Sequence, residues 1–423
     1  MTPPTRLCNR SFIIWLIASG QSQFGSAMGG LALSFLVLHQ TGQAGAMALT
    51  LAFALGPNLL MPLAGAWVDR VPLKVPLIAA DLLRGALVLT VALIALRLGN
   101  VPLWVINGSA FLGGMAGIFA SPASGAAFPA LVPESELARA NALQSSVQQG
   151  AGLLGTLLGG LLVARLGPPT ALLIDGLSFL VMAGLLPLVR LPGRPPLSDL
   201  PLSDPPLSGP RPSLVADLGA GLRLMGKSKL LSFAPPLSLL LNGALVTVTV
   251  LTPKLMDELG AGPGGYGLFT ALEGVGALIG GAVLAGLGSR VSPRRTTAVG
   301  LVLCGSLYLV MARFTTYPAL LACSLGLGLS FMVLNAPLVT LVQRLVPAAF
   351  RGRVFAVLGT ASSLGMPVTL LCVSPLLDRF PASVFYGAAG LAMLLGCLGW
   401  VLIVRSERAL PDLSGAAVTL AAD

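Results

Sequence analysis

Four charged side chains lie inside long apolar stretches of the sequence, where charges are rare. Asp81 and Arg84 share one stretch, Asp175 lies in another, and Glu273 lies in a third. Charges inside membrane-spanning segments usually pair with each other or face a cavity, so each is a functional hypothesis by default. A carboxyl removed from water holds its proton more tightly, and such a group can carry a proton from one side to the other.

The surroundings of these charges suggest different roles. Glu273 is the first proton-coupling hypothesis, because no basic residue lies within helical reach of it; the alternative is a carboxyl that is hydrogen-bonded to a neighbouring helix or hydrated in a cavity. Asp175 is the second, and hydrogen bonding to a neighbouring helix is an equal alternative for it. Asp81 and Arg84 are three residues apart and therefore share one helical face, so they are expected to form an intramembrane ion pair with a structural role.

The composition defines the class of protein that must position these charges. The chain has 423 residues, of which 55% are hydrophobic and only 9% charged, against about 25% charged in soluble domains. Most of the chain therefore cannot face water, which predicts an integral membrane protein. The net charge of +10 lies mainly in short loops between apolar runs, so it indicates membrane topology and not nucleic-acid binding.

Twelve apolar runs are long enough to cross a bilayer, and runs of this length do so as helices because the backbone must pair internally. The sequence therefore predicts an all-α integral membrane protein with twelve transmembrane helices. The expected spans are roughly 11–38, 46–68, 75–96, 102–124, 140–164, 168–189, 230–252, 265–288, 297–313, 318–342, 353–377 and 383–404.

The runs fall into two groups of six, separated by a segment of different composition. Residues 191–213 repeat Pro-Leu-Ser, a composition typical of a flexible linker. Leu214–Lys229 has apolar residues at helical spacing and is expected to be an amphipathic helix on the membrane surface. The predicted organisation is a first bundle over 1–190, a linker and surface helix over 191–229, a second bundle over 230–405 and a tail over 406–423.

The basic residues set the expected orientation. Most of the 25 lysines and arginines fall in loops on the same side as the N-terminus. Because basic loops stay in the cytoplasm, both termini are expected to be cytoplasmic, in a multi-pass protein of the cytoplasmic membrane.

A short loop between the second and third runs resembles the cytoplasmic signature of the major facilitator superfamily. The matching residues are Gly65, Asp69, Arg70 and Lys74, while Pro72 replaces the second glycine of that signature. An echo of the loop in the second half contains Gly286, Pro293 and Arg295. Within the superfamily, three further segments are similar to the third drug:proton antiporter group, which includes macrolide-efflux-like and siderophore-exporter-like proteins: residues 121–143, 266–268 and 351–355.

This resemblance implies a fold and a set of site residues. The fold is two pseudo-symmetric six-helix bundles around a central cavity, in which one bundle rocks against the other. The signature loop implies a gate, in which Asp69 pairs with Arg70, Lys74 or a helix end near Arg351 and Arg353. The cavity residues implied by position are Gln21, Phe24, Met28, Met115, Phe119, Gln148, Asn242, Phe331, Met332 and Asn335.

A glycine-rich part of the fifth run bears on the direction of transport. The antiporter pattern Gly-Pro-x-x-Gly-Gly is represented by Gly155 and Gly159-Gly160, with Thr156 in place of the proline. Glycines at this spacing indicate a close helix–helix contact whichever way the substrate moves.

The expected function is secondary transport and not catalysis. The sequence has no nucleophile–base arrangement, metal-ligand spacing or phosphate-binding loop, so no cofactor is expected and a proton gradient is the expected energy source. The first hypothesis is proton-coupled efflux of an amphipathic small molecule (a drug, macrolide or siderophore) by a monomer in the bilayer. The alternatives are uptake or facilitated transport of a small metabolite or lysolipid, and a non-transporting membrane adaptor or sensor with the same fold.

Overall fold

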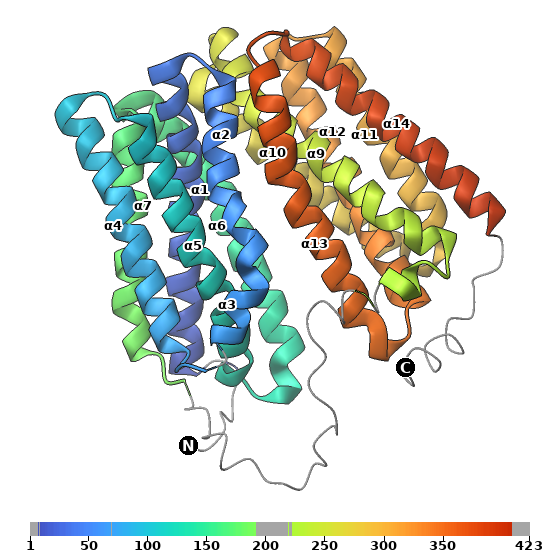
Figure 1. Ribbon diagram of the computed structural model, residues 1–423, viewed down its shortest axis with the longest axis horizontal. Helices are drawn as coiled ribbons and strands as arrows, with labels where there is room; N and C mark the ends of the chain where they lie inside the picture. The colour runs from blue at the N-terminus through green and yellow to red at the C-terminus, as the bar shows by residue number, and fades with distance from the viewer. Residues whose placement is uncertain (1–6, 8, 69, 192–218, 220–221, 408–423) are drawn as a thin grey trace, which may run out of the picture. The chain divides into compact units, whose positions relative to one another are not determined.

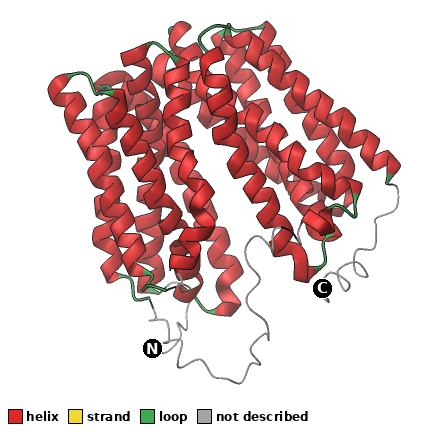
Figure 2. Ribbon diagram, viewed as in Figure 1, coloured by secondary structure: helices red, strands yellow, loops and turns green. Residues whose placement is uncertain are grey.

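The protein was analysed as a computed structural model, which describes residue 7 and residues 9–68, 70–191, 219 and 222–407. The regular secondary structure of these residues is helical throughout (Figure 2). A helix satisfies its backbone hydrogen bonds within one segment, which a chain in hydrocarbon requires.

The described residues of the first half of the chain form six long helical segments, which are coloured blue to green in Figure 1. In chain order they are α1 (Arg10–Thr41), α2 (Ala44–Leu55), η1 (Gly56–Leu60), α3 (Met61–Val68), α4 (Lys74–Leu98), α5 (Leu103–Ala127), η2 (Pro129–Leu131), η3 (Glu134–Glu136), α6 (Leu137–Leu166), α7 (Pro168–Leu185) and η4 (Leu186–Leu188).

The second half follows the same plan. Its described elements are α9 (Lys229–Glu258), α10 (Gly262–Leu287), η6 (Gly288–Arg290), α11 (Pro293–Arg313), α12 (Tyr317–Leu345), α13 (Ala348–Val373), η7 (Ser374–Leu376) and α14 (Ala382–Ser406).

Local sequence explains where the first helix begins and ends. The Asn9 side chain accepts a hydrogen bond from the Phe12 backbone N–H at 3.0 Å, which caps the N-terminus of α1. The helix ends at Gly42, whose φ of 66° places it in the left-handed region that favours glycine.

Ten helical segments among the described residues are long and apolar enough to cross a membrane, from Lys74–Leu98 to Ala382–Ser406. The other two predicted spans lie in α1, which has 32 residues, and in the run α2, η1 and α3. That run is helical but not uniform: it tightens to a 3₁₀ helix at Gly56–Leu60, where Pro57 has no N–H to donate. For these two segments the count of twelve stays a prediction.

Contacts between Cα atoms divide the chain into two compact units. Unit 1 contains Met1–Gly209 with Gly262–Gly267, and unit 2 contains Pro210–Ala261 with Leu268–Asp423. The predicted linker and surface helix lie largely outside the described residues. Of that segment, residues 222–225 are helical, and Leu224 and Met225 are buried.

The helix packing of unit 1 recurs in unit 2. In unit 1, α1 packs against α6 and α7, and α4 packs against α5 and α7. In unit 2, α9 packs against α13 and α14, and α11 packs against α12 and α14. Counted from the first helix of each unit, these are the same four pairs, which is the repeat expected of two related bundles.

Candidate functional site

In unit 1, three of the charges identified from the sequence lie together between α4 and α7. These helices pack closely, since a Cβ added at Gly85 would lie 3.0 Å from the Gly176 carbonyl oxygen. Asp81 and Asp175 are 7% and 5% exposed, and the Arg84 guanidinium interacts electrostatically with both. Two buried carboxyl groups therefore share one half-buried cation.

The predicted pair of Asp81 and Arg84 does not form as a direct contact. Within the described residues, no salt bridge within 4.0 Å joins them. The Arg84 Nε instead donates to the Gly113 carbonyl on α5 at 3.2 Å, and its guanidinium carbon lies 5.7 Å from the centre of the Phe179 ring. Because α5 and α7 hold the arginine, it interacts with Asp81 over a longer distance.

The Asp175 side chain packs against α1 at a place where glycines of that helix leave room for it. A Cβ added at Gly29 would collide with the Asp175 carboxyl, and one added at Gly25 would collide with the Ser178 side chain. Asp175 Oδ1 and Ser178 Oγ are buried without a hydrogen-bond partner. A buried polar atom without a partner costs about 1–3 kcal/mol, so Asp175 remains a second proton-coupling hypothesis.

In unit 2, Glu273 is half-buried and is the one charged side chain among the described residues that line its cavity. It lines a cavity of about 10 Å³, which is room for about one water molecule. The other lining residues come from α9, α11, α12 and α14: Leu241, Leu245, Cys304, Tyr308, Leu327, Phe331, Leu334 and Met393. No Lys, Arg or His lines this cavity, so a charged Glu273 would have no adjacent cation.

Glycines allow α10, the helix that carries Glu273, to pack directly against α12. A Cβ added at Gly328 on α12 would collide with the Glu273 carbonyl, and one added at Gly276 on α10 would collide with the Leu325 carbonyl. Small residues thus bring the two backbones into direct contact, as in many membrane helix pairs. The position of the Glu273 carboxyl therefore depends on the backbone contact between α10 and α12.

Most of the cavity residues expected in unit 1 have packing partners within that unit. The Gln21 amide donates to the Ser178 carbonyl at 2.8 Å, and Met28 is 4% exposed. A Cβ added at Gly155 would meet the Phe24 carbonyl, and one added at Gly159 would lie 2.9 Å from Met28 Cγ. The glycine-rich part of the fifth run thus forms a close contact of α6 with α1. Gln148 is half-buried.

Of the four cavity residues expected in unit 2, one lines the Glu273 cavity, and the other three form hydrogen bonds within their own helix or lie at a helix–helix contact. Phe331 is 40% exposed and lines the Glu273 cavity. The Asn242 amide donates to the Ser238 carbonyl at 2.8 Å, and that of Asn335 to the Phe331 carbonyl at 3.1 Å. Met332 lies near Gly280, where α10 and α12 meet.

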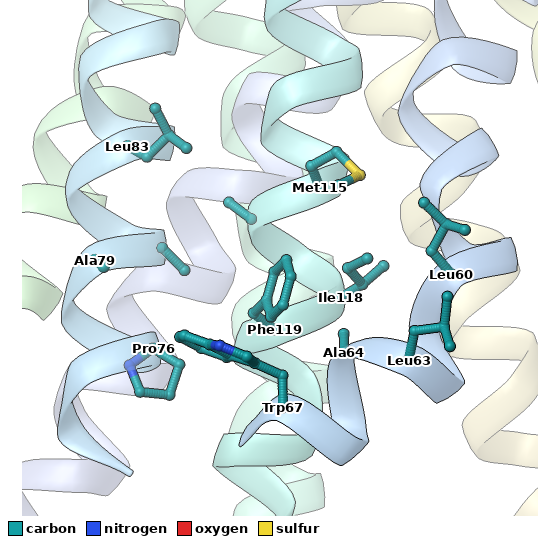
Figure 3. A pocket seen from close by; sticks show the side chains of 12 residues that line it. Leu60, Leu63, Ala64, Trp67, Pro76, Ala79, Leu83, Met115, Ile118 and Phe119 are labelled. Atoms are coloured by element: carbon teal, nitrogen blue, oxygen red, sulfur yellow. The ribbon is translucent and has the colours of Figure 1, made fainter. Parts of the chain in front are cut away.

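Met115 and Phe119 line a groove that the sequence did not reveal (Figure 3). The groove has a volume of about 420 Å³ and lies between η1–α3, α4 and α5 of unit 1. Trp67 closes it at one end, with its ring edge-on to Phe119 at a centroid distance of 5.3 Å. Trp67 lies between Gly65 and Asp69 of the signature loop. Its place in that loop was the only feature of the sequence that could have drawn attention to the groove.

The residues of the predicted gate lie at helix ends in both units. Asp69 lies outside the described residues. Lys74 donates from Nζ to the Pro187 carbonyl at 3.1 Å, and Arg351 donates from Nε to the Val346 carbonyl at 3.2 Å. Arg70 is exposed, Gly65 has no atom within 4 Å of an added Cβ, and the Arg353 guanidinium lies 4.9 Å from the centre of the Phe350 ring.

Long apolar helices in two repeated bundles, with acidic side chains inside the helices of each, define a multi-pass membrane protein of the transporter type. The family described as transmembrane secretion effector (MFS_3) matches residues 2–412. The chain belongs to this family and is a membrane transporter of the major facilitator superfamily.

Individual relatives cover nearly the whole chain. Macrolide efflux protein A of Streptococcus pyogenes is 25% identical over 94% of this chain and 96% of its own length. Multidrug efflux pump Tap of Mycobacterium tuberculosis is 27% identical over 93% of this chain and 92% of its own. A bacterial homologue of the iron transporter ferroportin, solved in an inward-facing state, matches the fold with a TM-score of 0.72 and 18% identity over 93% of this chain and 98% of its own.

Proposed function

We propose that the protein exports an amphipathic small molecule across the cytoplasmic membrane in exchange for protons. The single observation that carries the coupling is Glu273, an acid in a small apolar cavity of unit 2 that no basic side chain lines. Neutralising this carboxyl without a neighbouring cation requires a proton.

The proposed cycle follows from this requirement. With its proton, Glu273 is neutral and compatible with the apolar cavity between α9, α10, α11 and α12. Without the proton, the carboxylate is stable only if the cavity opens to water or to a cationic group. Binding and release of the proton therefore favour different arrangements of the helices around Glu273, which is how an ion gradient biases alternating access.

The export direction and the substrate class rest on the relatives, two of which are named for macrolide efflux and multidrug efflux. The orientation with both termini in the cytoplasm rests on the basic loops of the sequence. Macrolides and other bulky amphipathic compounds are accordingly the first substrates to screen.

The experiment is transport into everted membrane vesicles with an imposed pH gradient, acidic inside. The wild type is expected to accumulate a macrolide or dye substrate, while Glu273→Gln equilibrates it without accumulation and keeps its binding affinity. Glu258→Gln is the matched control, because Glu258 is an exposed acid at the end of α9. Equal accumulation by wild type and Glu273→Gln would exclude Glu273 from the coupling mechanism.

A further inference from the structure

The groove of unit 1, defined by Leu60, Leu63, Trp67, Leu83, Met115 and Phe119 (Figure 3), has no role in the coupling described above. Among the described residues that line it, the Trp67 indole N–H is the only polar side-chain group, and all the other side chains are apolar. Pockets for small molecules usually add a few placed polar groups that fix the orientation of the ligand. The absence of such groups among the lining residues favours a flexible hydrocarbon chain as the occupant.

The position of the groove makes membrane lipid the available source of such a chain. Leu63 is 65% exposed, Trp67 47% and Leu83 42%, and α4 and α5 are membrane-spanning helices. Exposed apolar surface on membrane-spanning helices is accessible to the acyl chains of the bilayer. A concave apolar surface of about 420 Å³ offers one chain more contacts than the flat face of a helix does.

The basic residues at the Trp67 end of the groove indicate which kind of lipid headgroup would lie there. The backbone N–H of the exposed Arg70 donates to the Trp67 carbonyl at 2.9 Å, so the arginine begins one turn beyond the groove. Exposed Arg10, Arg139 and Arg190 lie at the same helix ends of unit 1. Tryptophan is typical of the interface between headgroups and chains, and basic residues there attract anionic lipid.

We propose that this groove binds one acyl chain of an anionic phospholipid, whose phosphate is held by Arg70. The guanidinium supplies paired N–H donors that match phosphate oxygens, and Trp67 and Phe119 pack on the first part of the chain. The site is separate from Glu273, so it does not depend on the proposed direction or coupling of transport.

The test uses the fluorescence of Trp67 in protein reconstituted with lipids that carry brominated acyl chains. A bromine atom quenches tryptophan on contact, and the difference between wild type and Trp67→Phe isolates the Trp67 signal. We expect half-maximal quenching at an about fivefold lower mole fraction of brominated phosphatidylglycerol than of brominated phosphatidylcholine. This factor corresponds to the attraction of about 1 kcal/mol between one basic residue and an anionic lipid surface. Arg70→Gln removes this preference.

Trp104 provides the matched control. It is 77% exposed at the start of α5, at the end of that helix away from Met115 and Phe119, and its signal is isolated with Trp104→Phe. No preference between the two lipids is expected for it. Equal quenching of Trp67 by both lipids would overturn the proposal. Protection of Trp67 from both lipids by the transported compound would also overturn it and assign the groove to that compound.

Discussion

The two units pack their helices in the same pairs but differ in the charged side chains that these helices carry. Unit 1 places Asp81 and Asp175 around Arg84, so that the cation offsets part of the negative charge. Unit 2 places Glu273 in a cavity lined by no basic side chain. Because a carboxyl near a cation can remain charged without a proton, whereas an isolated one cannot, the two units are suited to different tasks.

We propose that this difference gives the charges of unit 1 a structural role and the carboxyl of unit 2 the role of proton coupling. In unit 1, the Arg84 guanidinium of α4 links three helices, since it donates to a carbonyl of α5 and lies near the Phe179 ring and the Asp175 carboxyl of α7. In unit 2, the only way to neutralise Glu273 within its own cavity is protonation. On this proposal the duplicated fold has one ionic centre that stabilises the structure and one centre that depends on a proton, and the following predictions test that division.

The largest expected effect on stability is that of Arg84→Gln. This change leaves Asp81 and Asp175 without their shared cation, and removal of one partner from a buried charge cluster typically costs about 3–5 kcal/mol. Thermal unfolding in detergent measures the loss. The double variant Arg84→Gln/Asp175→Asn is expected to recover part of it, and an unchanged melting temperature of the single variant would contradict a structural role for unit 1.

A smaller loss of stability is expected for Gly328→Ala in unit 2. The added methyl group would collide with the Glu273 carbonyl, and overpacking of this kind costs about 1–3 kcal/mol. It also displaces the Glu273 carboxyl, so the variant is expected to accumulate less substrate at a fixed pH gradient.

Gly359→Ala is the control, because a Cβ at Gly359 in helix α13 has no heavy atom within 4 Å. An alanine there is expected to be neutral or stabilising by up to about 1 kcal/mol. Equal stability and transport of the two alanine variants would show that the α10–α12 contact does not position Glu273.

The smallest effects are expected at the charged helix ends, where the units are alike. Lys74→Gln removes one hydrogen bond to the Pro187 carbonyl, and Arg351→Gln removes one to the Val346 carbonyl. Both donors lie at the surface, so each change is expected to lower the free energy of unfolding by less than about 1 kcal/mol. Chemical denaturation would measure both, and a loss as large as that of Arg84→Gln would place the ionic centre at the helix ends instead.

The sequence predicted the helices better than the directions of their side chains. Long apolar runs determine where a chain can cross a bilayer, and all ten confirmed spans overlap predicted ones. The spacing of Asp81 and Arg84 places both on one helical face, but the Gly113 carbonyl that holds Arg84 belongs to another helix and has no sequence signal.

The residues that line cavities could be predicted only in part, for the same reason. Position in the superfamily pattern identifies a span, whereas packing decides which face of that span is open. Met28 is buried against Gly159, while Met115 and Phe119 line a groove with Trp67. The glycines that permit these contacts are visible in the sequence, but their partners are not.

The most direct measurement compares two matched variants in the same vesicles. A gradient of one pH unit supplies about 1.4 kcal/mol per proton, which supports accumulation of up to about tenfold in one-for-one exchange. If unit 2 carries the coupling, Asp175→Asn retains gradient-dependent accumulation and Glu273→Gln reduces the concentration ratio to about one. Loss of the gradient response in Asp175→Asn with its retention in Glu273→Gln would contradict the account.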